Sequence, residues 1–303
     1  MRTSILWLSA LLLWTSLLVA HPLSSAAVTD NPPIPAQALL PASTDSAVIT
    51  PSFMDAVNQW MKRISNEQGY EAWKQATWTS YPLGPGTHGW IILLKSGGAE
   101  VGYMVLYADD PGNPNKYRLA EYGRGNTPLF SLNTLYRSLV QLELIDTSYQ
   151  AERWYSGPFY AVWKVTSGTS QYIIDAKTGE LLPVLSDKLP EADSLSVSSA
   201  PSVQPEHSIL STVQIEPFDP YDRLPWVSGK PIVFSSLEEL ETALTKERKL
   251  TFVTELYDRK VTVPLAVTGL QRWSDDSVFL LLDQEGTRAI PYDTVMKLGS
   301  VFP

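Results

Sequence analysis

Short turn-forming segments separate the apolar runs of this chain, and they constrain its fold more than any other feature. Gly84-Pro85-Gly86, Ser96-Gly97-Gly98 and Asp109–Asn115 connect consecutive strand-like runs between residues 76 and 122. Glycine, proline and asparagine accept the backbone angles that tight turns require. Connections this short join antiparallel neighbours, because a parallel pair of strands needs a much longer crossover. We therefore predict antiparallel sheet throughout this region.

Residues 52–185 form the first predicted domain, in which helices alternate with strands. Ser52 and Asp55 resemble a capping box at the start of one helix, and Ser131 is the expected N-cap of a second. The apolar residues of the first helix recur at helical spacing: Phe53, Val57, Trp60 and Ile64. The predicted strands are Ala76–Tyr81, Trp90–Lys95, Val101–Ala108, Tyr117–Tyr122, Glu152–Tyr155, Phe159–Thr166 and Gln171–Asp175.

Residues 209–303 form the second and smaller predicted domain, which is rich in strands and has one clear helix. Ser236 and Glu239 are spaced as a capping box at the start of that helix. Strands are predicted at Leu250–Leu256, Lys260–Val267, Leu270–Trp273, Val278–Asp283 and Thr287–Ile290, with a helical turn from Pro291 to Leu298. Short strands and tight turns favour a partly closed barrel here. The predicted fold class is α+β, with two small domains that each contain an antiparallel sheet and one or two helices.

Residues 1–27 have the order of parts that a secretory signal has. Arg2 precedes an apolar run over residues 5–20, and the small residues of 24–27 follow it. The apolar run is shorter than the roughly 20 residues that a membrane-spanning helix needs, although an uncleaved N-terminal anchor is the alternative. We therefore predict a secreted or extracytoplasmic protein.

Two segments have the composition of linkers. Prolines recur among Ala, Ser and Thr in residues 28–51, and residues 186–208 are rich in Ser and Pro. Segments with so few apolar residues cannot bury enough surface to offset the entropy lost on ordering. We predict that they separate the leader and the two domains.

The charge and the reactive side chains of the chain exclude several function classes. With 23 Lys and Arg against 32 Asp and Glu, the net charge of −9 disfavours binding to nucleic acid or to anionic lipid. The absence of cysteine removes disulfides, thiol nucleophiles and thiolate metal sites. His88 lies in a glycine-rich turn, no Gly-x-Ser-x-Gly elbow accompanies it, and His207 lies in the predicted linker. We predict no cofactor, no metal and no catalytic residue.

Two pieces of the first domain have a recognisable pattern. One is Val101–Leu106 (VGYMVL) with Arg118–Gly123 and Thr127–Phe130, and the other is Tyr172–Leu182 (YIIDAKTGELL). Together they resemble PepSY-type domains and the inhibitory pro-domains of secreted bacterial peptidases. The resemblance implies a non-catalytic module that packs against a peptidase or another envelope protein. No His-Glu-x-x-His motif and no serine elbow occurs in this sequence, so we expect the partner to be a separate chain.

Four aromatic residues are the candidate contacts for such a partner: Tyr103, Tyr122, Trp154 and Tyr155. Aromatic side chains supply large apolar area at a low entropy cost. An edge strand such as Val101–Ala108 could also take up an extended peptide by strand addition. The predicted function is an exported, non-catalytic binding or regulatory module at the bacterial cell envelope, which modulates a secreted peptidase.

Two alternatives come from other classes. A hydrolase of cell-wall polysaccharide would need paired carboxylates, for which Glu121, Glu143, Asp146 and Asp175 are available. A purely structural envelope protein would need no soluble partner. Sequence alone gives no distances between these carboxylates, so the alternatives stay open at this stage.

Overall fold

A computed structural model describes residues 50–84, 87–110, 113–191 and 203–303. The predicted leader and all but the last two residues of the proline-rich linker lie outside the described residues. Within them the helices are α1 (Pro51–Ile64), α2 (Leu132–Gln141), α3 (Pro225–Ser228), α4 (Leu237–Thr245) and α5 (Tyr292–Leu298). The first strands are β1 (Thr77–Pro82), β2 (Gly89–Ser96), β3 (Ala99–Asp110), β4 (Asn113–Arg124), β5 (Gln150–Tyr155), β6 (Ala161–Ser167) and β7 (Ser170–Asp175). The later strands are β8 (Ile209–Gln214), β9 (Leu250–Leu256), β10 (Val261–Trp273), β11 (Val278–Asp283), β12 (Thr287–Pro291) and β13 (Ser300–Phe302).

Three of the helices begin at a residue whose side chain caps the first turn, and one of these N-caps differs from the predicted residue. The N-cap of α1 is Thr50 rather than Ser52, because the Thr50 hydroxyl accepts a hydrogen bond from the Phe53 N–H at 3.2 Å and Pro51 occupies the first helical position. The predicted caps of α2 and α4 are confirmed. Ser131 accepts from Thr134 N–H at 3.3 Å, and Ser236 accepts from Glu239 N–H at 3.3 Å.

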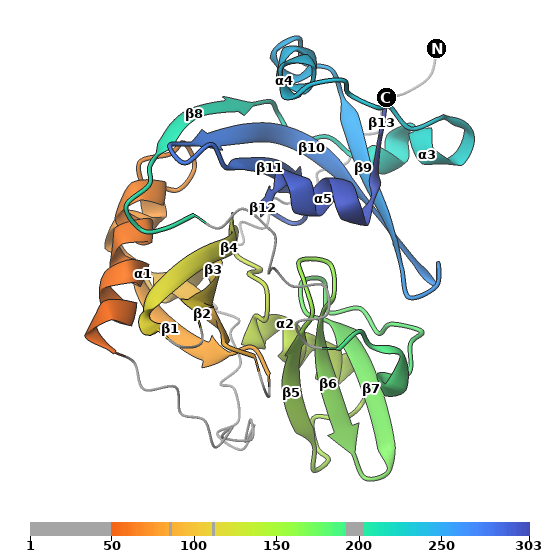
Figure 1. Ribbon diagram of the computed structural model, residues 1–303. Coiled ribbons are helices and arrows are strands. Elements are labelled where there is room, and N and C mark those ends of the chain that lie inside the picture. Colours follow the sequence, from red (N-terminus) through yellow and green to blue (C-terminus); the bar gives the residue numbers. More distant parts are fainter. Residues whose placement is uncertain (1–49, 85–86, 111–112, 192–202) are drawn as a thin grey trace, which may run out of the picture. The chain divides into compact units, whose positions relative to one another are not determined.

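The α+β class and the antiparallel pairing are confirmed, but the separation into two domains is not. Among the described residues, one ten-stranded sheet runs β1-β2-β3-β4-β12-β11-β10-β9-β13, with β8 paired to β10 (Figure 1). Antiparallel pairing of β4 with β12, through Tyr122–Ala289 and Gly123–Arg288, joins the two predicted domains in this sheet. The strand order is an open path and not a closed barrel.

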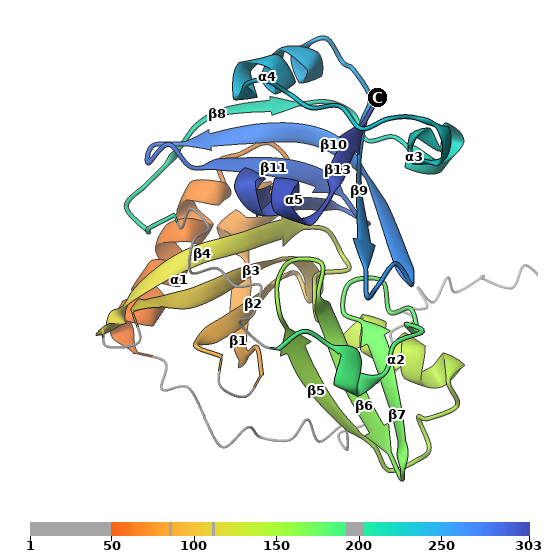
Figure 2. The same cartoon turned by 45° about the vertical axis from the view of Figure 1, so that its right-hand side comes forward.

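Strands β5, β6 and β7 form a separate three-stranded antiparallel sheet, which is seen beside the large sheet in Figures 1 and 2. Apolar side chains of the two sheets share one core cluster. Leu93 of β2 and Val105 of β3 belong to it together with Ala151 of β5 and Trp163 of β6. The small sheet therefore covers part of one face of the large one.

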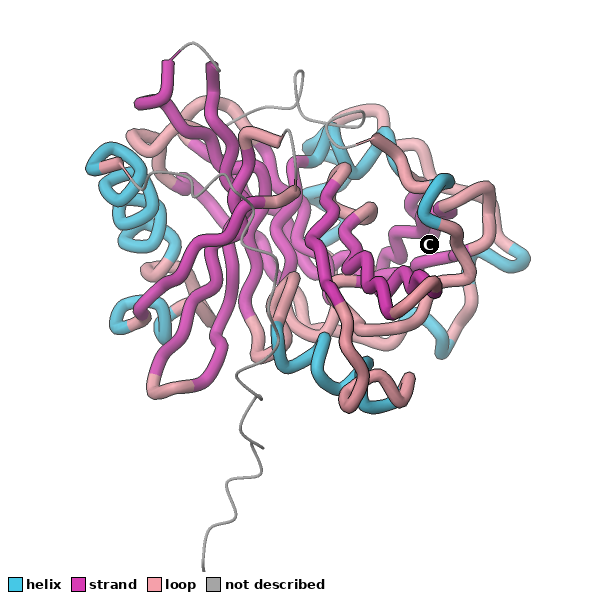
Figure 3. The backbone as a smooth tube through the Cα atoms, turned by 90° about the horizontal axis from the view of Figure 1, so that it is seen from below, coloured by secondary structure: helices cyan, strands magenta, loops and turns pink. Residues whose placement is uncertain are grey.

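Strand β2 shows how the sequence encodes a sheet covered on both sides. Ile91 and Leu93 face the cluster shared with the small sheet, whereas Ile92 and Leu94 face the cluster that contains α1. Residues alternate between faces along a strand, so a continuous apolar run indicates burial on both faces. Figure 3 shows the same arrangement from below, with strands inside and helices on the outside.

Three features differ from the sequence prediction. One continuous strand, β10, replaces the two predicted strands Lys260–Val267 and Leu270–Trp273; it begins at Val261 and has a register shift between Val267 and Gly269. The short strands β8 and β13 were not predicted. Val203, which was assigned to a linker, is fully buried, and its carbonyl accepts from Leu119 N–H at 3.1 Å.

The turn between β11 and β12 gives a testable consequence of this packing. Gly286 has φ +111°, and a Cβ atom there would collide with the backbone carbonyl of Arg124 at the end of β4. We expect Gly286→Ala to lower the free energy of unfolding by about 2 kcal/mol, from backbone strain and overpacking. Gly97→Ala is the matched control, because Gly97 also has positive φ, +59°, but has no atom within 4 Å of the added Cβ. Equal losses in urea denaturation would show that the contact with β4 contributes nothing.

Candidate functional site

A buried ion pair lies where the large sheet meets the small one. Arg288 of β12 and Glu121 of β4 are 2% and 0% exposed, and Arg288 Nη2 lies 3.1 Å from both carboxylate oxygens of Glu121. Arg288 also donates to the Tyr103 hydroxyl at 3.0 Å, to Gln284 Oε1 at 2.7 Å and to the Pro158 carbonyl at 2.5 Å. Because Pro158 lies between β5 and β6, this network ties the two sheets together.

The ionisation of this pair is set by burial and by its own charges. Burial raises the pKa of the Glu121 carboxyl, while the charge of Arg288 and a hydrogen bond from Tyr103 lower it. Burial disfavours the charged form of Arg288, but Glu121 opposes this effect and holds the guanidinium pKa above its ordinary value. The Glu121 carboxylate is thus bound by two side chains of the protein, those of Arg288 and Tyr103. We interpret the pair as a structural contact.

Lys177 makes a second polar contact between the sheets. It follows β7, is 3% exposed, and donates from Nζ to the Thr127 carbonyl, to Thr127 Oγ1 at 3.3 Å and to the Glu285 carbonyl at 3.1 Å. Burial, helped by the charge of Arg288, lowers its pKa to about 8. The turn that holds it is fixed by Asp175, whose Oδ1 accepts from Lys177 N–H at 2.8 Å.

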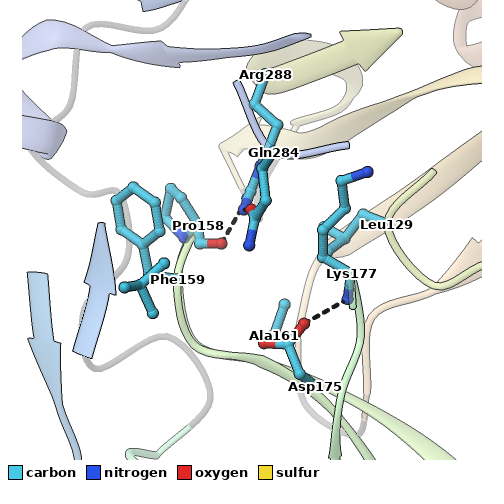
Figure 4. A pocket seen from close by; sticks show the side chains of 9 residues that line it. Leu129, Pro158, Phe159, Ala161, Asp175, Lys177, Gln284 and Arg288 are labelled. Carbon is cyan, nitrogen blue, oxygen red and sulfur yellow. Dashed lines mark hydrogen bonds between the residues drawn. The ribbon is translucent and has the colours of Figure 1, made fainter. Parts of the chain in front are cut away.

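A small cavity lies between these two groups. It is lined by Leu129, Pro158, Phe159, Ala161, Asp175, Lys177, Val263, Gln284 and Arg288 (Figure 4). Its volume is about 10 Å³, which is room for about one water molecule. This cavity is therefore too small for a sugar or a peptide.

Three of the four predicted partner contacts are core residues, which corrects that prediction. Tyr103, Tyr122 and Tyr155 are 1%, 0% and 1% exposed. Each side chain belongs to a buried core of the protein, and Tyr122 donates its hydroxyl to Gln271. Trp154 is partly buried, donates Nε1 to the Pro190 carbonyl at 2.9 Å, and lies under the Lys164 ammonium at 4.3 Å from its ring centroid.

The predicted edge strand is also corrected. Val101–Ala108 belongs to β3, which is paired with β2 on one side and β4 on the other. Among the described residues, β1 and β13 end the sheet order, and β8 is a third edge because it pairs only with β10. The outer side of β13 is partly covered, because Ile232 N–H donates to the Val301 carbonyl at 2.7 Å. No described residue pairs with the outer side of β1.

The segment of residues 221–233, which precedes α4, exposes several apolar side chains. Tyr221, Leu224, Val227 and Val233 are 59%, 42%, 70% and 88% exposed. Trp226 packs edge-on against Tyr221, with ring centroids 5.5 Å apart. Exposed apolar residues in such a cluster are typical of contact surfaces.

The carboxylates considered for a hydrolase have separate local roles. Glu121 is enclosed with Arg288, Glu143 is exposed after α2, and Asp175 caps the turn after β7. Asp146 is also exposed. No hydrogen bond joins any two of these carboxylates within the described residues.

The two histidines of the described residues have only local contacts. His88 is exposed, and its carbonyl accepts from Ala108 N–H at 2.8 Å. His207, expected to be unsupported, has Nδ1 at 3.2 Å from the Ser274 hydroxyl. Within the part of the chain that the structure describes, no three His, Asp or Glu side chains are grouped as a metal site.

Sequence reasoning missed Arg153, Lys177 and Arg288 as the charged residues of the interior. Their positions in the sequence could have indicated burial, because Arg288 and Arg153 stand among the buried residues of strands and Lys177 lies in the turn quoted for the PepSY resemblance.

None of the helices in the described ranges has the length and apolar character to cross a membrane. No protein-family model matches this chain, and no curated protein is significantly similar to it.

Proposed function

We propose that this chain is an exported, non-catalytic protein that binds another protein of the bacterial cell envelope, and that β1 takes up an extended segment of the partner by strand addition. The observation that carries the proposal is the unpaired outer side of β1 among the described residues. Strand addition uses backbone hydrogen bonds for affinity and side-chain pockets for specificity.

The register of β1 shows which of its backbone groups are available. Leu83 N–H, immediately after β1, donates to the Gly89 carbonyl of β2 at 3.1 Å. The direction of the backbone N–H and C=O groups alternates along an antiparallel strand. The backbone groups of Thr79 and Tyr81 therefore point toward β2, while those of Trp78 and Ser80 point outward. The strand contains no charged residue, and Pro82 at its end is the one edge-protecting residue in it, since proline has no N–H to donate to an added strand. Among the described residues, the outward N–H groups of Trp78 and Ser80 therefore have no strand partner.

A secreted peptidase is the partner class that we favour. The PepSY and pro-domain resemblance supports it, and peptidases bind chains in extended form. The polysaccharide hydrolase gains no support from the carboxylates, because each has a separate structural environment.

Ser80→Pro is the sharpest test, because it removes an outward N–H without removing a bond to β2. Proline is tolerated at such edge positions. We expect the variant to keep the unfolding midpoint of the parent while its affinity for the partner falls about tenfold or more, corresponding to one lost hydrogen bond and steric exclusion of the added strand. Affinity and inhibition are measured against the peptidases that the same organism exports.

Two further variants complete this test. Ser80→Ala keeps the N–H and should bind as the parent does, whereas Thr79→Pro removes a bond to β2 and should lower stability. Unchanged affinity of Ser80→Pro would overturn strand addition at β1. If Val227→Asp abolished binding instead, the contact would be assigned to the 221–233 segment. No binding and no inhibition across all exported peptidases would end the peptidase proposal.

A further inference from the structure

Arg153 is a buried cation that is held between two aromatic rings. It lies on β5 with 8% exposure, opposite Trp163 of β6. Its guanidinium carbon is 4.7 Å from the Trp163 ring centroid and 4.1 Å from the ring centroid of Tyr81 on β1. Aromatic faces on a planar guanidinium fix its orientation and leave its edges for hydrogen bonds.

The hydrogen-bonding edge of this guanidinium has no partner within the described residues. Nε and Nη2 are both buried and make no hydrogen bond there, and the ion pairs of the same residues do not include Arg153. Nε–H and Nη2–H point the same way, and together they form the fork to which a carboxylate binds through both oxygens. Burial lowers the pKa of Arg153 to about 10, so the group is charged at neutral pH.

We propose that Arg153 is a carboxylate-binding site, in which the two oxygens of the ligand take the Nε–H and Nη2–H fork in the plane between Tyr81 and Trp163. A single buried positive charge is neutralised by a single negative charge, which favours a monoanionic carboxylate over a dianionic phosphate. The planar, two-oxygen shape of a carboxylate also matches the fork.

The ligand can be a free small carboxylate or a carboxylate carried by a peptide. The site does not depend on the proposed function, but Tyr81 belongs to β1, so a peptide added to that edge would bring a carboxylate near it. Gly84 of the β1–β2 connection passes close to the same residue, since a Cβ on Gly84 would lie 3.0 Å from the Arg153 carbonyl. Because the fork is covered, the ligand must displace its immediate neighbours to enter.

The test follows the Nε–H signal of Arg153 by NMR in the ¹⁵N-labelled full chain, assigned by its loss in Arg153→Lys. Acetate is titrated against chloride at equal ionic strength and against acetamide. A second arm compares a peptide ending in a free carboxylate with its C-terminal amide. We expect only carboxylates to shift the signal. Arg153→Lys keeps the charge but loses both the fork and the Nε–H signal, so its affinity for acetate is measured from the acetate-dependent rise of the unfolding midpoint, and we expect that affinity to be about tenfold weaker or worse.

Each outcome decides the matter. If acetate shifts the Arg153 Nε–H signal, the ligand of the site is a free small carboxylate. If only the peptide with a free C-terminal carboxylate shifts it, the ligand is a carboxylate carried by a peptide. No shift with either, or equal binding by Arg153→Lys, overturns the site. Arg259→Lys is the control, because Arg259 is 82% exposed and paired with Glu255. Ser80→Pro should leave acetate binding intact, so this proposal and strand addition at β1 can fail independently.

A stability measurement supplies a second readout. Without ligand, we expect Arg153→Met to leave the unfolding midpoint unchanged or to raise it, because a buried charge without a counter-ion is removed. Acetate should raise the midpoint of the parent protein and not that of the variant. A lower midpoint for Arg153→Met, unaffected by acetate in either protein, would make Arg153 a packing residue and overturn the proposal.

Discussion

Replacement of Arg288 by methionine is expected to lower the free energy of unfolding by about 3–5 kcal/mol, the range for breaking a buried ion pair from one side. Glu121, which is fully buried, would lose its charge partner. The Tyr103 hydroxyl and the Pro158 carbonyl would lose hydrogen bonds at the same time. Urea denaturation followed by tryptophan fluorescence measures the effect.

A double variant separates the orphaned charge from lost packing. Glu121→Leu combined with Arg288→Met removes both charges and should recover at least about 1 kcal/mol relative to Arg288→Met alone. Arg259→Met removes a guanidinium from an exposed pair and should change stability little. If Arg288→Met lowered the free energy of unfolding no more than Arg259→Met does, the buried ion pair would not contribute to stability.

The second large effect is the pH dependence that Lys177 imposes. Its pKa is about 8 in the folded protein and 10.5 for the unperturbed side chain. Between these values the unfolded chain binds more protons than the folded chain, so a rise in pH stabilises the fold. The unfolding free energy of the parent, measured relative to Lys177→Met, should therefore rise by about 3 kcal/mol between pH 8 and pH 10.5.

The comparison between parent and variant isolates this residue from tyrosines that titrate in the same range. Lys177→Met also leaves the Thr127 and Glu285 carbonyls without a donor, but this loss is the same at every pH. Lys246→Met, at an exposed position, controls for the removal of one lysine. A parent-minus-variant difference that stays flat from pH 8 upward would show that Lys177 keeps its proton in the fold.

Local chemistry made many elements predictable. The capping pairs at Ser131 and Ser236 were found because a cap is a contact between residues three apart in the chain. The bounds of β9 and β11 matched because both are apolar runs between turns. Strand β8 was missed because it is only half-buried and polar, so that its identity depends on pairing with β10.

The candidate sites were far less predictable than the elements. Tyr103 and Tyr155 were placed on a surface because their types suit contacts, yet both are enclosed by the second sheet. Arg153 looks like an ordinary strand residue in the sequence. It becomes notable because Tyr81, a residue of another sheet, covers one face of its guanidinium. A contact between two different sheets leaves no periodic pattern in the sequence from which it could be predicted.

The sequence by itself determined the α+β class, the antiparallel hairpins and most helix starts, because these depend on side-chain alternation, turn residues and caps within a few positions. Only the tertiary structure decided that β4 pairs with β12 and that Arg288, Lys177 and Arg153 lie inside. Those outcomes depend on which apolar faces cover one another. That choice is made between segments that are distant in the sequence, where burial of shared surface and neutralisation of charge outweigh local preference.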